Sequence, residues 1–344
     1  TNWNHSSAGA MVMQAPDFWQ YGRGGLGAMM LAPVGWLYGN IAKSRMSAAV
    51  PWQAPVKVIC VGNLVAGGAG KTPVAISIAQ RLMDRNATPH FLSRGYGGTL
   101  TGPLKVDTEE HRATDVGDEP LLLAHLCPTW IAANRQAGCQ AAIEAGANVV
   151  VMDDGYQNPG LAKDLSLVVF DGGFGFGNGR VMPAGPLREP TAFGLGRADA
   201  VVIVGDDTTQ ITEGLNTAGY TGPILNARIE PTGTASDLSH ELSGQPVVGF
   251  AGIGRPDKFL STLQEIGCDV RNFHAFADHH PYNHAEITRI LNEAETTGAR
   301  VVTTEKDMVR LPDDIGDKVT VVGIDIVWDD AAALNDLLDE VSNA

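Results

Sequence analysis

The stretch Val56–Pro73, "VKVICVGNLVAGGAGKTP", decides the fold. A short apolar run leads into a glycine-rich turn that ends in Gly-Lys-Thr, and helical spacing comes directly after it. Strand, turn and helix N-terminus together make a phosphate cradle, because backbone N–H groups converge there and the helix adds partial positive charge. We expect Lys71 to reach the β- and γ-phosphates and the Thr72 hydroxyl to ligate Mg²⁺. The predicted phosphate-binding residues are Gly67, Gly68, Ala69, Gly70, Lys71 and Thr72.

This turn departs from the strict phosphate-loop pattern G-x-x-x-x-G-K-[ST]. The pattern requires glycine at position 65, where this chain has Val65. A structural turn with a surface lysine is the alternative, but the strand before and the helix after favour phosphate binding. A dinucleotide site is disfavoured, because "GIGRPD" from Gly252 lacks the third glycine of that fingerprint.

Apolar runs rich in β-formers alternate with helical stretches along the chain, as in "PHFLSR", "ANVVVMDD", "LSLVVFD" and "ADAVVIVGD". This alternation predicts an α/β fold, a mostly parallel sheet of the P-loop NTPase type covered by helices on both faces. The pattern resets around Gly222. We therefore predict an N-terminal apolar helical segment over 11–50, a P-loop core over 51–222 and a smaller C-terminal α/β domain over 223–344.

The composition limits the possible partners and the compartment. The chain has 344 residues, 44% hydrophobic and 18% charged, which is typical of a folded protein. A net charge of −15 argues against nucleic acid as a partner. Four scattered cysteines without a C-x-x-C pair indicate neither a disulfide framework nor a zinc site, and fit a reducing compartment.

The N-terminal part is basic and apolar. Residues 1–60 carry four basic side chains against Asp17 alone, so the acidity lies in the rest of the chain. Leu26–Ala42, "LGAMMLAPVGWLYGNIA", is 17 residues long and contains Pro33, which puts it at the lower limit for a spanning helix. Basic flanks and aromatic ends favour an anchor in the membrane interface. A helix packed as ordinary core is the alternative.

The first ten residues, "TNWNHSSAGA", are unlike the rest of the chain in character. We expect them to be partly vector-derived, with the native start at Met11 or Met13, and we leave them out of the fold prediction.

Two acidic motifs could serve phosphoryl transfer. "VVVMDDGYQN" (149–158) ends an apolar strand with Asp153 and Asp154. An aspartate there helps to hold Mg²⁺ in P-loop enzymes, but adjacent strand residues point in opposite directions unless the chain turns. "VGDEP" (116–120) offers Asp118 and Glu119. They read equally well as a base near an attacking hydroxyl or as the start of a helix.

Two further segments carry candidate polar groups. "GNGRVMPAGPLREP" (177–190) can position Arg188 for phosphate, or be a surface loop. "FADHHPYNH" (276–284) has three histidines, and Pro281 argues against a helical metal site there. A catalytic or orienting histidine and an ordinary surface both remain open.

Together these segments resemble one family. The chain contains, in order, "VGNLVAGGAGKTP", "SRGYGG", "GDEP", "DDGYQN", "GNGRVMPAGPLREP", "FAGIGRPDKF", "DHHPY" and "TTEKD", as do the tetraacyldisaccharide 4'-kinases, the lipid A 4'-kinases. "APDFW" and "LAPVGWLYG" also resemble the N-terminus of that family, and Val65 is no exception within it. Eight motifs in order make the resemblance highly specific.

The resemblance implies an enzyme at the cytoplasmic face of the inner membrane, peripheral or N-terminally anchored. It would transfer the γ-phosphate of ATP, with Mg²⁺, to the 4'-hydroxyl of a tetraacylated glucosamine disaccharide 1-phosphate and so produce lipid IVA. The partners would be that lipid and the membrane surface. A soluble P-loop NTPase or assembly factor and a non-catalytic membrane-peripheral binding protein are the competing classes.

The resemblance also assigns roles to residues. Lys71 and Asp118 would be catalytic, with Asp118 the base oriented by His279, and His280 the fallback. The metal or supporting carboxylates, which sequence does not rank, are Asp153, Asp154, Glu119 and Glu189, together with the Thr72 hydroxyl. The substrate-binding candidates are Arg94, Asn178, Arg188 and His280.

Overall fold

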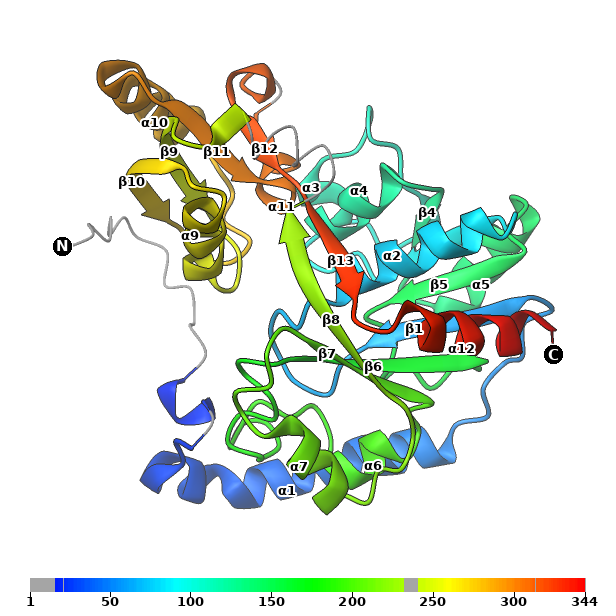
Figure 1. The fold of residues 1–344 in the computed structure, drawn as a ribbon. Helices are drawn as coiled ribbons and strands as arrows, with labels where there is room; N and C mark the ends of the chain where they lie inside the picture. Colours follow the sequence, from blue (N-terminus) through cyan, green and yellow to red (C-terminus); the bar gives the residue numbers. More distant parts are fainter. Residues whose placement is uncertain (1–15, 21, 232–240, 313, 344) are drawn as a thin grey trace.

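The computed structural model describes residues 16–20, 22–231, 241–312 and 314–343 (Figure 1). The expected vector-derived residues, both candidate starts and the first part of the predicted 11–50 segment lie outside the described residues. The described chain forms two sheets, one of nine strands and one of four.

The nine-stranded sheet has the order β13-β8-β7-β6-β1-β5-β2-β4-β3. Strands β8 to β4 in that order are parallel to one another, while β3 and β13 at the two edges are antiparallel to their neighbours. The strands are β1 (Lys57–Gly62), β2 (Pro89–Ser93), β3 (Leu104–Lys105), β4 (Thr129–Ile131), β5 (Val149–Asp153), β6 (Leu165–Asp171), β7 (Ala200–Val204), β8 (Ile224–Pro231) and β13 (Ile324–Trp328).

Helices cover both faces of this sheet. One core contains apolar side chains of α2 (Lys71–Asp84), α4 (Asp118–Ala124) and α12 (Ala331–Asn343). The other contains those of α5 (Arg135–Glu144), α6 (Thr191–Leu195) and α7 (Ile211–Thr217). The central strands are buried along their whole length, as expected of parallel strands covered twice. The predicted α/β class with a covered, mostly parallel sheet is thus confirmed.

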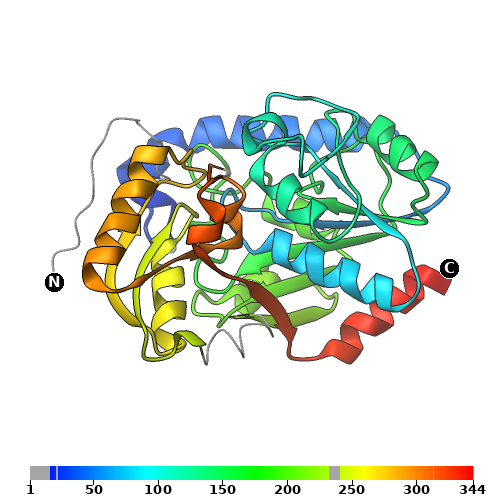
Figure 2. The same cartoon turned by 90° about the horizontal axis from the view of Figure 1, so that it is seen from above.

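The four-stranded sheet, in the order β10-β9-β11-β12, is entirely parallel. Its strands are β9 (Pro246–Ala251), β10 (Asp269–Ala275), β11 (Arg300–Thr304) and β12 (Thr320–Val322). α9 (Pro256–Glu265) packs on one face and α10 (His284–Thr297) on the other. We call this sheet and its helices the second lobe, and Figures 1 and 2 show it to one side of the large sheet.

The division between the sheets differs from the predicted boundary at residue 222. β8 pairs in parallel with β7, and β13 returns from the second lobe to pair antiparallel with β8. Trp328 of β13 is 7% exposed and donates its indole N–H to Ser77 Oγ of α2 at 2.9 Å. Both strands therefore belong to the large sheet, and the strands of the second lobe lie within 246–322.

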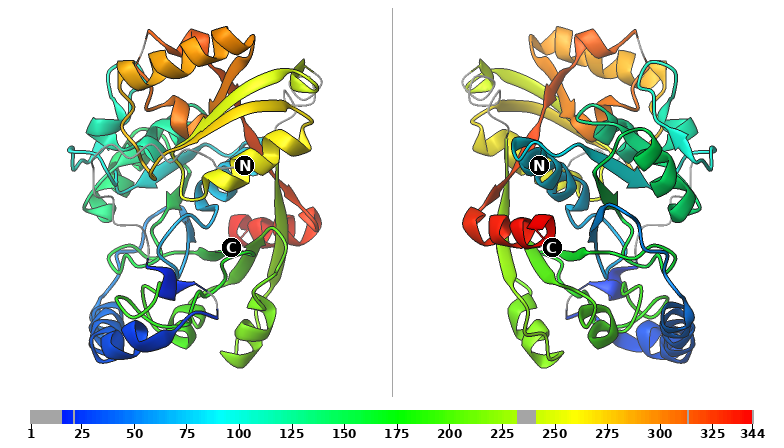
Figure 3. Two further views of the ribbon diagram at one scale, coloured as in Figure 1. Left: turned by 90° about the vertical axis from the view of Figure 1, so that its left-hand side faces the viewer. Right: turned by 90° about the vertical axis from the view of Figure 1, so that its right-hand side faces the viewer.

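The N-terminal segment consists of a short 3-10 turn, η1 (Asp17–Trp19), and the long helix α1 (Gly25–Ala48), which lies at the opposite end of the molecule from the second lobe (Figure 3). Small residues face the protein: a Cβ added at Gly35 would come within 2.6 Å of the Val181 carbonyl oxygen. Outward lie the exposed side chains of Leu26, Met29, Met30, Val34, Trp36, Leu37 and Ile41. None of the described helices is both long enough and apolar enough to cross a bilayer.

The remaining short helices are α3 (Ala113–Val116), α11 (Glu305–Met308) and η2 (Gly316–Lys318). α11 is the one that matters for the site, since it contacts α4 and so joins the second lobe to the large sheet.

Candidate active site

The glycine-rich turn connects β1 to α2 as the sequence predicts. Gly70, with φ +82°, precedes the first turn of α2, and Gly67 has φ +118°. A Cβ added at Gly67 or Gly68 would meet nothing within 4 Å, so their backbone borders open space. Lys71 and Thr72 begin the helix and are each 8% exposed. Such a turn presents N–H groups and a helix N-terminus to an anion.

Val65 explains why the strict motif fails here. It is 4% exposed and forms an isolated antiparallel bridge with Leu187. The Pro186 carbonyl accepts from Ala66 N at 2.8 Å, and Arg188 N donates to the Leu64 carbonyl at 2.8 Å. The first half of the turn is therefore bonded to the 186–188 segment, which an extended, β-branched residue suits better than glycine.

Asp153, at the end of β5, lies against the phosphate loop. Its Oδ2 accepts a hydrogen bond from Thr72 Oγ1 at 2.9 Å. The residue is 1% exposed, and its Oδ1 has no hydrogen-bond partner among the described residues. Burial, and then the charge of Glu119, raises the pKa of Asp153 to about 7. A buried carboxylate oxygen without a partner beside a threonine hydroxyl fits a site that receives a cation.

Asp154 reaches the same site because the chain turns there. Its φ of +52° ends the strand, so the two adjacent carboxylates do not point to opposite faces of the sheet. Arg188 donates to both oxygens of Asp154, at 2.6 and 3.1 Å, and Lys71 Nζ lies 3.7 Å from Oδ2. Burial alone would raise the pKa of Asp154, but Lys71 and Arg188 outweigh it and lower the pKa.

Glu189 is fixed by other side chains. It is 1% exposed, accepts from Gln157 Nε2 at 3.0 Å and forms an ion pair with Arg197. Gln157 Oε1 in turn accepts from Arg188 at 3.3 Å. Glu189 is thus linked to Arg188 through Gln157 and can help to orient it. A direct contact between Glu189 and a metal ion stays a prediction.

Asp118 and His279 meet although they lie far apart in the sequence. His279 Nδ1 lies 2.9 Å from Asp118 Oδ2, and Asp118 is 4% exposed. Burial alone would raise the pKa of Asp118, but the hydrogen bond to His279 and the positive charges of Lys306 and Arg310 outweigh it and lower the pKa to about 2. Asp118 also begins α4, as the helix-start interpretation of its motif predicts, and its role as a base stays a prediction.

His280 turns into the second lobe instead. Its ring stacks on Phe276 with centroids 4.7 Å apart, and Nε2 lies 3.1 Å from Glu286 Oε2. His284 is exposed, 3.5 Å from Asp314 Oδ1. Across the described ranges, no group of three or more His, Cys, Asp or Glu side chains could hold a metal ion by itself.

Glu119 is joined to the second lobe through Lys306. Nζ of Lys306 lies 3.4 Å from Glu119 Oε1, 3.9 Å from Asp118 Oδ2 and 3.9 Å from Asp278 Oδ1. Burial alone would lower the pKa of Lys306, but the surrounding carboxylates, Glu119 first, outweigh it and raise the pKa. Lys306 lies in "TTEKD", a motif that carried the resemblance but received no role from the sequence.

Arg94 and Asn178 are the two remaining substrate-binding candidates. Arg94 is exposed, and it adds to the positive charge around the buried Arg135. Arg135 was missed from sequence, since no motif surrounds it. The amide nitrogen of Asn178 donates to the carbonyls of Phe18, at 2.6 Å, and Ala184, at 2.9 Å. These bonds join η1 to the 177–190 segment, so substrate contact by Asn178 stays a prediction.

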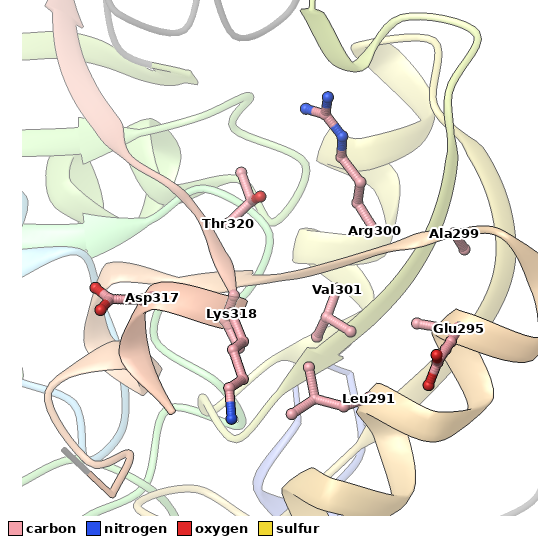
Figure 4. Close-up of a pocket in the computed structure, with 10 residues that line it drawn as sticks. Leu291, Glu295, Ala299, Arg300, Val301, Asp317, Lys318 and Thr320 are labelled. Carbon is pink, nitrogen blue, oxygen red and sulfur yellow. The ribbon is translucent and has the colours of Figure 1, made fainter. Parts of the chain in front are cut away.

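Two hollows lie away from these groups. One, of about 340 Å³, lies beside β11 and η2 in the second lobe and is bordered by Arg300, Lys318 and Glu295 over Leu291 and Val301 (Figure 4). A larger one, of about 790 Å³, lies near the start of α1 and includes Arg23, Asn178 and Arg180. Neither includes Lys71 or Asp118.

A phosphate loop, a Thr72–Asp153 pair fit for a cation, and a buried aspartate paired with a histidine define a P-loop kinase. Residues 27–343 match the family model described as tetraacyldisaccharide-1-P 4'-kinase. The chain belongs to this family.

Relatives and a solved structure agree with this assignment. The chain is 50% identical to a tetraacyldisaccharide 4'-kinase of Rhodospirillum rubrum over 96% of this chain and 98% of that protein. It is 48% identical to one of Paramagnetospirillum magneticum over 96% of this chain and 99% of that protein. A crystal structure of the "apo" form of LpxK from Aquifex aeolicus in complex with ATP is also similar, with a TM-score of 0.72 and 26% sequence identity. The match covers 92% of this chain and 99% of that chain.

Proposed function

We propose that this kinase transfers the γ-phosphate of ATP to the 4'-hydroxyl of a tetraacylated glucosamine disaccharide 1-phosphate, giving lipid IVA. The observation that carries the proposal is the pairing of the buried Asp118 with the half-buried His279 near a phosphate loop. Hydrolysis by an NTPase does not need an alcohol-activating pair of this kind, whereas transfer to a sugar hydroxyl does.

The second lobe brings this pair to the phosphate loop. A Cβ added at Gly254 would lie 3.5 Å from Asp278 Oδ2 and 4.0 Å from Gly68 N. The turn with His279 and the phosphate loop thus border the same short segment. An alcohol placed between them would have the γ-phosphate on one side and Asp118 on the other, so Asp118 could accept its proton as its oxygen attacks the phosphorus.

Asp118 is then the acceptor for the hydroxyl proton, and His279 orients it. Hydrogen bonds and positive charge keep the Asp118 carboxylate ionised, with a pKa of about 2, so it is ready to accept at neutral pH. Such an acceptor is weak, but the transition state of phosphoryl transfer is loose and asks mainly for alignment. Lys71 carries the positive charge for the phosphates, and Arg188 holds Asp154 in place beside it.

Mg²⁺ would be held by the Thr72 hydroxyl and Asp153, with Glu119 and Asp154 behind them. When bound, the ion neutralises phosphate charge. Mg²⁺ commonly takes only one or two protein carboxylates and completes its shell with phosphate oxygens and water. That habit agrees with a site that offers one unpartnered carboxylate oxygen and no larger cluster among the described residues.

The lipid would be met at α1, and the enzyme would work at the cytoplasmic face of the inner membrane, peripheral or N-terminally anchored. The apolar outer side of the helix, with Trp36 71% and Met30 79% exposed, is the kind of surface that enters the headgroup boundary. Arg94 and Arg188 are the candidates for the 1-phosphate of the substrate. The double variant Met30→Asp/Trp36→Asp should no longer sediment with anionic vesicles, and unchanged sedimentation would refute the membrane proposal.

The kinase proposal is tested in detergent micelles with Mg-ATP labelled in the γ-phosphate and the disaccharide 1-phosphate lipid. Wild type should label the lipid, and Asp118→Ala should lose about 100- to 10,000-fold in rate, the range for a positioned base. Asp339→Ala, an exposed aspartate on α12, is the matched control and should react normally. Label released only as free phosphate, with or without lipid, would instead establish a soluble NTPase.

A further inference from the structure

A buried arginine of the second lobe contacts the carboxylate of Asp118. Arg310, just after α11, is 4% exposed at its side chain, and its Nε lies 3.5 Å from Asp118 Oδ2. It belongs to "TTEKDMVR" (303–310), most of which has no part in the chemistry proposed above. Burying a guanidinium is costly unless it is paired and hydrogen-bonded, so its partners indicate what it does.

Four hydrogen bonds hold the guanidinium inside the second lobe. Nε donates to the Lys306 carbonyl at 3.0 Å, and Nη1 donates to the carbonyls of Gly252, at 3.0 Å, and His280, at 3.4 Å. Nη2 donates to Asp307 Oδ1 at 2.9 Å. With each nitrogen engaged, the plane of the group has one orientation, and the edge near Asp118 cannot swing away.

Asp307 holds the guanidinium of Arg310 in this orientation. It is fully buried, and its Oδ1 accepts from Gly252 N at 2.8 Å and from the Tyr282 hydroxyl at 2.6 Å. Its Oδ2 accepts from the Thr304 hydroxyl at 2.6 Å. A carboxylate with four donors holds its guanidinium partner rigidly and joins β9, β11 and the turn after β10.

The same arginine supports the turn that carries His279. His279 has φ +58°, a left-handed conformation that a histidine adopts only at some cost. His279 N donates to the Gly252 carbonyl at 3.1 Å, the oxygen that also accepts from Arg310 Nη1. Arg310 Nη1 also donates to the carbonyl of His280, the residue that follows His279. Arg310 therefore stabilises this turn both through the acceptor of His279 N and through the carbonyl of His280.

We propose that Arg310, held by Asp307, is a positioning residue for phosphoryl transfer, which fixes the carboxylate of Asp118 and the imidazole of His279 in one mutual geometry. The pair would then be built by both parts of the molecule: Asp118 from the large-sheet side, and its two supports from the second lobe. The proposal rests on the role proposed above for Asp118.

The test compares Arg310→Ala, Arg310→Lys and wild type under saturating lipid and ATP. Arg310→Ala should lose about 100-fold in kcat, the scale of a misplaced catalytic group, with the Kd for ATP changed less than threefold. Arg310→Lys keeps the charge but cannot donate to all the acceptors at once, so its loss should be about tenfold. Millimolar guanidinium chloride should restore part of the kcat of Arg310→Ala by filling the site, whereas sodium chloride at equal ionic strength should not.

Arg271→Ala is the matched control, because Arg271 is an exposed arginine of the same lobe whose ion pair is with Asp269 two residues away. It should keep wild-type kcat with and without guanidinium. The proposal fails if Arg310→Ala retains more than a third of kcat. It also fails if the variant binds ATP normally and guanidinium restores nothing. Should Arg310→Ala not fold, Arg310→Lys decides, and a wild-type kcat in it overturns the proposal.

Asp118→Asn in the same series separates the two proposals. Full activity in that variant would remove the role of Asp118, whatever Arg310 does. An inactive Asp118→Asn beside a fully active Arg310→Ala would leave the role of Asp118 standing and remove only that of Arg310.

Discussion

Two buried aspartates of the candidate site, Asp118 and Asp153, are in opposite electrostatic states. Asp118 is surrounded by His279, Lys306 and Arg310, and its pKa is lowered to about 2. Asp153 is 1% exposed with one unpartnered oxygen, and its pKa is raised to about 7. Around the first carboxylate the protein's cations outweigh the effect of burial, whereas the charge of Lys71 near the second does not. The difference separates a proton acceptor from a cation ligand without reference to sequence motifs.

The largest expected effect comes from replacing Lys71. Its positive charge favours the ionised form of both Asp153 and Asp154. Lys71→Ala should reduce lipid phosphorylation about 100- to 1,000-fold or more, because the phosphates lose a preorganised charge. The fold should survive, since Arg188 still pairs with Asp154. Phosphorylation kinetics and circular dichroism check both statements. Lys57→Ala, a more exposed lysine of β1, serves as control, and near-normal turnover in Lys71→Ala would end the phosphate-loop assignment.

Asp153→Asn should stabilise the protein in the absence of metal. A folded pKa of about 7 lies above the unfolded value, so the stability that protonated Asp153 provides is present below about pH 4 and lost as pH rises through about 7. In EDTA at pH 8, Asp153→Asn should therefore exceed wild type by up to about 4 kcal/mol in unfolding free energy, and by little near pH 4. Denaturant unfolding at both pH values measures this.

The same unfolding measurement with Mg-ATP added tests whether Asp153 binds the cation. Wild type should gain stability on addition of Mg-ATP, because the cation meets the Asp153 carboxylate, and Asp153→Asn should gain much less. Equal gains in both proteins would show that Asp153 does not face the metal. Asp339→Asn, an exposed aspartate, should behave like wild type throughout.

Some residues of the candidate site could be predicted from the sequence, and others could not. The phosphate loop was found because strand, turn and helix are consecutive, and the Asp118–His279 pair was found through the resemblance. Arg310 was not found, because its contacts with Asp118 and Gly252 join residues far apart in the chain, and nothing local distinguishes it from a surface arginine. Asp154 depended on a positive φ that a strand pattern does not reveal.

The fold shows the same limit. The class of fold could be predicted from alternating apolar runs, because each βαβ unit is local. β8 and β13 were expected in the second lobe, since they come after the reset near Gly222. Their membership of the large sheet depends on an antiparallel pairing across a whole intervening lobe, with Trp328 opposite Ala227. Periodicity alone carries no information about which sheet such a strand joins.

The smallest expected effect is the counterpart at Asp118, and it has the opposite sign. Its folded pKa of about 2 lies below the unfolded value, so the ionised Asp118 contributes stability above about pH 4 that is lost as pH falls through about 2. Asp118→Asn should therefore lower the unfolding free energy by about 2–3 kcal/mol at pH 8, through the lost pairing with its three cationic neighbours. At pH 3 about half of the difference should remain, and the two proteins should converge only below about pH 2.

Opposite signs for Asp118→Asn and Asp153→Asn, measured in the same EDTA buffer, are what the contrast between the two carboxylates demands. Each substitution removes one carboxylate and adds one amide at an almost fully buried position, so cavity and packing effects are closely matched. The surrounding charges and hydrogen bonds differ. If both variants were destabilised equally at pH 8, the unpartnered oxygen of Asp153 would have a partner in solution, and the assignment of Asp153 as the cation ligand would fall while that of Asp118 remained.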